Sequence, residues 1–196
     1  MNYQELIDNI RDLGFSDDTE MEEFGELLYN SINRAITDIN LNVAPIISKY
    51  EFEIEKTDTG LLYITIPEID ENFLDFGDTP VLFAQGDTEL YKRFNDYEIE
   101  SGDTVIIDAD NTYGEFRIFY KAEHEHFTGI ETQLAEEIPL PLRAHFLVPL
   151  LAAYYVWLED EPSKAAQYYN LYEQKAASLI AQTTDKIRMR VLKGGI

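Results

Sequence analysis

Residues 138–181 read IPLPLRAHFLVPLLAAYYVWLEDEPSKAAQYYNLYEQKAASLIA, and this stretch decides the fold class. Its apolar residues predict a helix over 142–159 that Pro149 kinks, because an internal proline removes a backbone hydrogen bond. A polar turn follows at 160–163, and a return helix covers about 164–183. Two helices joined by so short a turn lie antiparallel. The C-terminal part of the chain is therefore predicted to be an αα-hairpin.

The N-terminal residues 2–43 are also predicted to be helical. Apolar side chains recur there at intervals of three and four residues, which is the spacing that places them on one face of a helix. We expect these N-terminal helices to pack against the C-terminal hairpin and to share one apolar core with it.

Between these regions the pattern changes to a period of two, which is typical of strands with one buried face. Residues 50–55 (YEFEIE) alternate apolar and acidic side chains and are predicted to pair with 62–66 across a turn. A second predicted hairpin joins 104–108 to 115–121. The stretch 67–80, which is rich in Asp, Glu and Phe, is expected to be a loop.

The predicted fold class is α+β: a helical bundle of N-terminal helices and a C-terminal αα-hairpin, with a small antiparallel β unit inserted between them. The predicted segments are the N-terminal helices at 1–49, the β insertion at 50–129, the C-terminal hairpin at 130–183, which forms one core with 1–49, and a basic C-terminal tail at 184–196.

The charge of the chain is unevenly distributed. The 196 residues include 38 acidic and 15 basic side chains, giving a net charge of −23. Residues 161–196 carry +3, so residues 1–160 carry −26. An acidic surface of this kind repels phosphate backbones, which excludes nucleic-acid binding over the whole molecule.

Several catalytic and cofactor-binding classes are excluded by missing motifs. The chain has no cysteine, which excludes a thiolate metal site and a cysteine nucleophile. It has no glycine-rich phosphate loop, no GxSxG and no HExxH. The N-terminus does not read as a secretory signal, and the apolar window at 140–158 contains Arg143, His145 and Pro149, as expected of a buried helix. We therefore expect no enzymatic activity, no cofactor and no membrane association.

One cluster has the residue types of a metal site. His124 and His126 flank Glu125, and two histidines at this spacing on a strand lie on one face. Zinc needs two further ligands, however, and polar residues are also expected where a strand enters a loop. We predict no metal site and retain His124 and His126 as the candidates.

Tyrosine is abundant in the predicted hairpin. Core packing alone explains these side chains, but tyrosine is also favoured at protein interfaces because it is large, stiff and polar at its tip. Both interpretations stand. The candidate residues of an oligomer interface are Tyr154, Tyr155, Tyr168, Tyr169 and Tyr172.

The order of elements resembles that of phage head-to-tail adaptor proteins, including the tail-tubular and head-completion proteins of short-tailed phages. In that group a proline-marked start precedes an alanine-rich helix, a short acidic turn and a second helix with spaced alanine, tyrosine and glutamate. The resemblance covers most of the chain in layout and 138–181 in sequence. The residues that carry it are Pro139, Pro141, Leu151, Ala152, Ala153, Asp160, Ala165, Tyr169, Tyr172 and Glu173.

This resemblance implies a structural protein of the virion, made in the host cytoplasm and placed at the head–tail junction. Such adaptors form a homo-oligomeric ring, usually twelve-fold, between the portal protein and the tail or a further connector protein. DNA passes through the ring without specific binding. The C-terminal segment docks onto the portal, a role that here falls to Lys186, Arg188, Met189, Arg190, Val191 and Lys193.

The alternative hypothesis is an acidic binding protein or DNA mimic of a mobile element that acts on a basic partner. A mimic requires only a charged surface. The long hairpin with its tyrosines and alanines therefore favours the adaptor.

Overall fold

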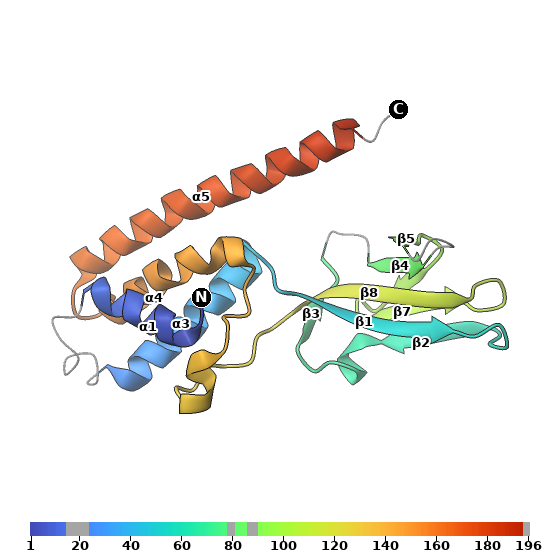
Figure 1. The fold of residues 1–196 in the computed structure, drawn as a ribbon, viewed down its shortest axis with the longest axis horizontal. Helices are drawn as coiled ribbons and strands as arrows, with labels where there is room; N and C mark the ends of the chain where they lie inside the picture. The colour runs from blue at the N-terminus through green and yellow to red at the C-terminus, as the bar shows by residue number, and fades with distance from the viewer. Residues whose placement is uncertain (15–23, 78–80, 86–89, 194–196) are drawn as a thin grey trace. The chain divides into compact units, whose positions relative to one another are not determined.

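The computed structural model describes residues 1–14, 24–77, 81–85 and 90–193, with side chains described up to residue 182. The chain forms two compact units (Figure 1). The first, which we call the helical unit, comprises Met1–Pro45 and His124–Ile196. The second, the β unit, comprises Ile46–Glu123. Both ends of the chain thus build the helical unit, and the middle of the chain builds the β unit.

The helical unit is organised around one helix that is apolar on all sides. Eight of the ten residues of α4 are buried, and α4 packs against α1, α3 and α5. A helix without a polar face must be covered on every side, which explains why the other helices surround it. The elements of this unit are α1 (Tyr3–Asp12), α3 (Gly25–Asn42), η2 (Glu131–Ala135), η3 (Leu142–Leu147), α4 (Val148–Trp157) and α5 (Pro162–Lys193).

The helix predicted over 142–159 is not continuous. The 3₁₀ helix η3 covers its first part, and α4 begins at Val148, so that Pro149 lies in the first turn of α4. A proline in the first turn costs no hydrogen bond, because the N–H groups there have no partner within the helix. The predicted kink is therefore wrong: the helix starts at the proline instead of bending around it.

The return helix is longer than predicted. Helix α5 continues to Lys193, whereas the sequence pattern ended it near Thr183. Among the described side chains, the buried positions of α5 are Ala165, Tyr172, Ala176 and Leu179. The apolar stripe that guided the prediction ends there, and the backbone remains helical beyond it.

The segment that returns from the β unit is held by an aromatic side chain. The ring of Phe127 stacks on Tyr3 at a centroid distance of 4.2 Å and meets the edge of Tyr29 at 5.2 Å. Asn33 of α3 fixes the same residue, because its side-chain amide donates to the Phe127 carbonyl and accepts from the Phe127 N–H, both at 2.8 Å. These contacts anchor the segment to α1 and α3.

The β unit contains more structure than predicted. Among the described residues it has eight strands in two antiparallel sheets with one shared apolar core, so the predicted fold of a helical bundle with a small β unit is wrong. The first sheet has the order β1-β8-β4-β5, with β3 also paired to β8, and the second has the order β2-β7-β6. The strands are β1 (Ile47–Ile54), β2 (Leu61–Thr65), β3 (Phe73–Asp75), β4 (Leu82–Gln85), β5 (Tyr91–Arg93), β6 (Glu98–Glu100), β7 (Thr104–Asp108) and β8 (Gly114–Ala122).

Part of the stretch predicted as a loop is also ordered into secondary structure. The 3₁₀ helix η1 (Ile66–Glu68) extends into it, strand β3 lies within it, and Phe76 is buried in the core of the β unit. The phenylalanines of this stretch therefore serve as core residues. The acidic side chains between them masked that role in the sequence.

Both predicted hairpin pairings are wrong, although their strands are present. Strand β1 pairs with β8, and β2 pairs with β7, so each pair of consecutive strands is split between the two sheets. The turns after β1 and β7 carry the chain from one sheet to the other and bond to each other. Gly60 donates to the Asp110 carboxylate at 2.9 Å, and Ala109 donates to the Gly60 carbonyl at 2.9 Å.

The chain enters and leaves the β unit at neighbouring positions. The Ala122 N–H donates to the Ile46 carbonyl at 3.1 Å, and Ile47 is aligned with Lys121 in the β1–β8 register. The first and last strands of the unit are thus hydrogen-bonded to each other along their length. This pairing closes the β unit on itself.

Gly129 is expected to tolerate no side chain. Its φ is +79°, and a Cβ at this position would overlap the ring of Tyr29. We expect Gly129→Ala to lower the free energy of unfolding by about 3 kcal/mol, combining the left-handed backbone cost with the steric clash. Chemical denaturation followed by helical circular dichroism measures this effect.

The matched control is Gly25→Ala in the same unit. Apart from its chain neighbours and the backbone of its own helix, no atom of the described residues lies within 4 Å of a Cβ at Gly25, which is in α3. This control should leave stability unchanged or slightly raise it. Equal effects of the two substitutions would contradict the close approach of Gly129 to Tyr29.

Candidate functional site

Four of the five candidate tyrosines come together where α4 packs on α5. Tyr154 lies 4.9 Å from Tyr155 and 4.9 Å from Tyr169, measured between ring centroids. Tyr169 lies 6.0 Å from Tyr172. We call these four residues the tyrosine cluster. Tyr168 is half-buried and, among the described residues, makes no ring contact with the four.

Helix α3 fixes the cluster through a pair of charged side chains one turn apart. The Tyr155 hydroxyl donates a short hydrogen bond to the Asp38 carboxylate, and the Arg34 guanidinium lies 4.1 Å above the centre of the Tyr155 ring. Burial, followed by the hydrogen bond to Asp38, raises the pKa of Tyr155 above its usual range. The hydroxyl therefore remains a donor at physiological pH, and its ring is held in one orientation.

The cluster reaches from the core to the surface. Tyr172 is buried, and burial, with the charge of Glu173 next in effect, raises its pKa to about 12. Tyr154 and Tyr155 are half-buried, whereas Tyr169 is 39% exposed. One edge of a rigid aromatic cluster is thus available to another molecule.

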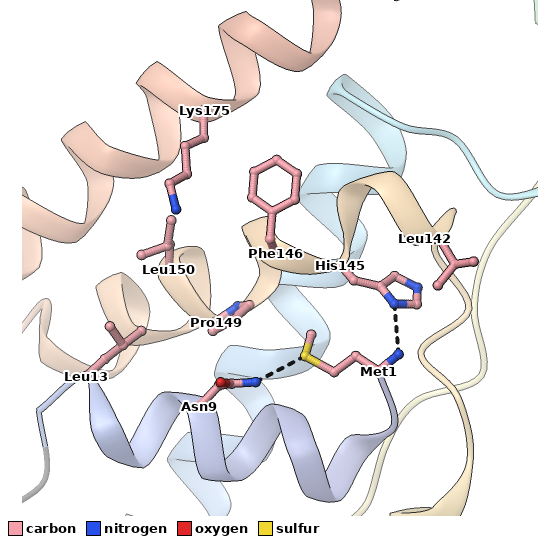
Figure 2. A pocket seen from close by; sticks show the side chains of 9 residues that line it. All are labelled: Met1, Asn9, Leu13, Leu142, His145, Phe146, Pro149, Leu150 and Lys175. Atoms are coloured by element: carbon pink, nitrogen blue, oxygen red, sulfur yellow. Dashed lines mark hydrogen bonds between the residues drawn. The ribbon is translucent and has the colours of Figure 1, made fainter.

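A pocket of about 510 Å³ lies elsewhere in the helical unit, between α1, η3, α4 and α5 (Figure 2). Its walls are mainly apolar, and Lys175 extends into it from α5, with its Nζ 5.6 Å from the centre of the Phe146 ring. We call it the Lys175 pocket. Its lining residues are Met1, Asn9, Leu13, Leu142, His145, Phe146, Pro149, Leu150 and Lys175.

The histidine in this pocket is committed to structural contacts. His145 is buried, its Nε2 lies 2.7 Å from the Leu140 carbonyl, and its Nδ1 lies 3.1 Å from the Met1 nitrogen. Since a carbonyl only accepts, Nε2 carries the proton and Nδ1 is the acceptor. Both ring nitrogens are occupied, so His145 has no free atom for acid–base chemistry in this arrangement.

In the β unit, charged side chains gather on one face of the first sheet. Glu51 pairs with Arg117 at 2.6 Å and with Lys49 at 2.9 Å. The hydrogen bond from Lys49, together with the charge of Arg117, lowers the pKa of Glu51. The next register pair places Glu53 directly opposite Glu115, and like charges in that position repel. This face can therefore accept a cationic group from a partner.

Among the described residues, the two metal candidates are not part of a larger ligand set. The rings of His124 and His126 lie 5.4 Å apart, but His124 is buried and His126 is exposed. In the described part of the chain, no group of three or more His, Cys, Asp or Glu side chains is placed to hold a metal ion. The Nε2 of His124 is buried and makes no hydrogen bond to any described residue.

The predicted docking residues lie in the last turns of α5. The backbone there is helical up to Lys193, while the side chains of Lys186, Arg188, Met189, Arg190, Val191 and Lys193 lie outside the described part.

Sequence reasoning missed the residues that complete both sites. Arg34 and Asp38 are one helical turn apart on α3, a spacing typical of exposed charge pairs, and nothing in the sequence links them to Tyr155. Lys175 and Phe146 are 29 positions apart in the sequence and meet only after η3 and α5 pack.

Comparisons with known proteins assign neither site. No protein-family model matches the chain, and no curated protein matches it at a significant level. Among the helices of the described residues, none combines the length and the apolar character needed to cross a membrane.

We expect His124 to make the helical unit less stable in acid. Burial, with the imidazole of His126 contributing next, lowers the pKa of His124 to about 4, whereas an unfolded histidine titrates near 6.5. Between these values the unfolded chain binds a proton that the folded chain does not, so stability falls as the pH drops from about 6.5 to about 4.

His124→Gln should reduce the loss of unfolding free energy between pH 7 and pH 4.5, as measured by denaturant melts at each pH. His126→Gln, at the exposed neighbouring position, is the control and should largely retain the wild-type dependence. If all three proteins lose the same amount of stability, His124 does not titrate in this way.

Proposed function

We propose that the chain is a structural virion protein without catalytic activity: a head-to-tail adaptor that forms a homo-oligomeric ring between the portal protein and the tail. In this proposal DNA passes through the ring without specific binding, and the protein resides at the head–tail junction. It needs no cofactor and no membrane. The proposal combines the resemblance of 138–181 to phage adaptors with the features described below.

The tyrosine cluster is the observation that carries the proposal. Aromatic side chains supply much of the binding energy at protein interfaces, and tyrosine does so at low entropic cost when its ring is already ordered. Here the rings support one another, and Asp38 and Arg34 hold Tyr155. An isolated protein needs no rigid aromatic edge at its surface, whereas a subunit that packs against its neighbours does.

The charge distribution supports a docking role for the end of α5. Residues 161–196 carry +3 against −26 for residues 1–160, and four of the last eleven residues are basic with none acidic. Among the described side chains of α5, the last buried one is Leu179. A segment with four basic and no acidic side chains is suited to bind an acidic partner surface.

The acidic body supports the conduit part of the proposal. A wall of net negative charge repels the phosphate backbone, so DNA slides past it without binding. The alternative function, an acidic binding protein or DNA mimic, is favoured by one observation, the opposed Glu53 and Glu115 on the first sheet. A mimic would bind a basic partner as a monomer or dimer.

Imaging the chain mixed with its cognate portal protein tests the proposal directly. Electron microscopy should show a ring of subunits attached to the portal. Absence of both a ring and any portal binding would refute the adaptor. Binding to a basic protein through a monomer or dimer would favour the mimic.

The tyrosine cluster should be required for ring formation. We expect Tyr169→Ala to weaken the association of subunits on the portal at least about 10-fold, the effect typical of an aromatic interface residue. Tyr63→Ala is the matched control, because Tyr63 is 56% exposed and lies in the β unit. Mass photometry of the assembled complexes measures both. If the two variants assemble equally well, the tyrosine cluster is not part of the subunit interface.

Deletion of 186–196 should leave the fold intact and abolish portal docking. The deleted part lies beyond Leu179, the last buried residue among the described side chains of α5. Circular dichroism checks the fold, and co-sedimentation with the portal checks the docking. An unchanged affinity for the portal would show that the basic segment does not dock.

A further inference from the structure

The Lys175 pocket has an apolar interior and one basic side chain at its edge. Leu150 forms part of the wall and is 6% exposed, whereas Phe146 is 44% and Leu142 is 76% exposed at the rim. Apolar surface that stays in contact with water costs free energy, which burial by an occupant recovers. A volume of about 510 Å³ accommodates one or two large side chains.

The charges of this pocket are unusual for so acidic a chain. The protein has 38 carboxylates, yet none belongs to a described residue that lines the pocket. Lys175 is exposed, makes no ion pair with any described residue, and its Nζ lies over the Phe146 ring. The complementary occupant is therefore an apolar side chain followed closely by a carboxylate.

The turn between α4 and α5 offers this combination. Leu158 is 38% exposed, and the next three residues, 159–161, are exposed and acidic. Glu161 is 3.7 Å from Lys164, whereas Glu159 and Asp160 form no ion pair within the described residues. The turn thus exposes one apolar side chain and two carboxylates that form no ion pair with a described residue.

The turn is also rigid, which lowers the entropic cost of docking. The Glu161 N–H donates to the Trp157 carbonyl at 2.9 Å, which continues the helical bonding of α4. The Lys164 ammonium lies 3.3 Å above the Trp157 ring and donates to the Gly14 carbonyl at 2.8 Å. These contacts fix the start of α5 against the end of α4.

The turn cannot reach the pocket of its own chain. Pro149 and Leu150 place the pocket at the N-terminal end of α4, and the turn follows the C-terminal end of this ten-residue helix. Ten helical residues span about 15 Å. A contact between the two features must therefore join different copies. Because the two surfaces differ, the contact is of the head-to-tail kind, which closes into a ring when the rotation between subunits permits.

We propose that the α4–α5 turn of one copy docks in the Lys175 pocket of the next copy. Leu158 enters the apolar pocket, and Glu159 and Asp160 pair with Lys175 of the neighbouring copy. This inference rests on the proposed ring and identifies a contact that holds it together, in addition to the tyrosine cluster.

Disulfide trapping tests the contact cleanly, because the natural chain has no cysteine. One protein carries Asp160→Cys and the other Lys175→Cys; they are mixed with the cognate portal and oxidised mildly. We expect a covalent dimer that contains one copy of each variant. The control partner is Gln167→Cys, an exposed position about 12 Å along α5 from Lys175, which should give little cross-linked product.

A charge exchange tests the same contact without covalent chemistry. Lys175→Glu and Asp160→Lys should each weaken subunit association at least about 10-fold at low salt. The double variant should recover most of the lost affinity. All substituted side chains are exposed, so melting curves should match that of the wild type.

Two results together would overturn this contact: rings form on the portal without a cross-link between positions 160 and 175, and the charge-exchange variants assemble as the wild type does. The proposed adaptor function would be unaffected by these results. Equal cross-linking of Asp160→Cys to both partners would overturn the contact as well. Failure to form any assembly with the portal refutes the proposed function itself, and the contact with it.

Discussion

The burial of α4 is the constraint on which the helical unit depends. A ten-residue helix with eight buried residues has no face to offer water, so it is stable only when other elements cover it on every side. Helices α1 and α3 precede the β unit in sequence, and α5 follows α4. The helical unit therefore cannot complete its core until the chain after residue 123 is available. The β unit, with its own closed core, is free of this requirement.

The sequence was informative about local structure and much less about pairing. The alternation in YEFEIE identified β1, because a strand with one face in the core and one face exposed to solvent alternates apolar and polar residues. This alternation shows which side chains face the core, but it does not show whether the next strand pairs in the same sheet or belongs to the sheet on the other side of the core. Ile54 and Ile64 thus look like neighbours in a hairpin, but they belong to opposite sheets of one core. The residues of β8 that align with β1 lie 60 to 74 positions further along the chain. A local sequence pattern therefore cannot identify this pairing.

For the candidate sites as well, the sequence predicted local features but not the contacts between distant segments. The abundance of tyrosine in the predicted hairpin gave the five candidate interface residues, and the structure brings four of the five together. Their anchors on α3 could not be predicted, because packing alone brings Asp38 to Tyr155. The Lys175 pocket could not be predicted from the sequence for a related reason: its lining comes from α1, η3, α4 and α5 and from residues next to α1, and each of these elements contributes only one to three of the lining residues.

The β unit is connected to the rest of the chain through two adjacent strands. Because β1 and β8 run antiparallel and the Ala122 N–H bonds to the Ile46 carbonyl, the two crossing points of the backbone lie beside each other. Insertion at such a point disturbs the host little, since the ends to be joined are already close. The β unit is thus a replaceable module: evolution or an experimenter can exchange its sheets for another domain while the helices keep their core. Changes in the β unit then need not alter the packing of the helical unit.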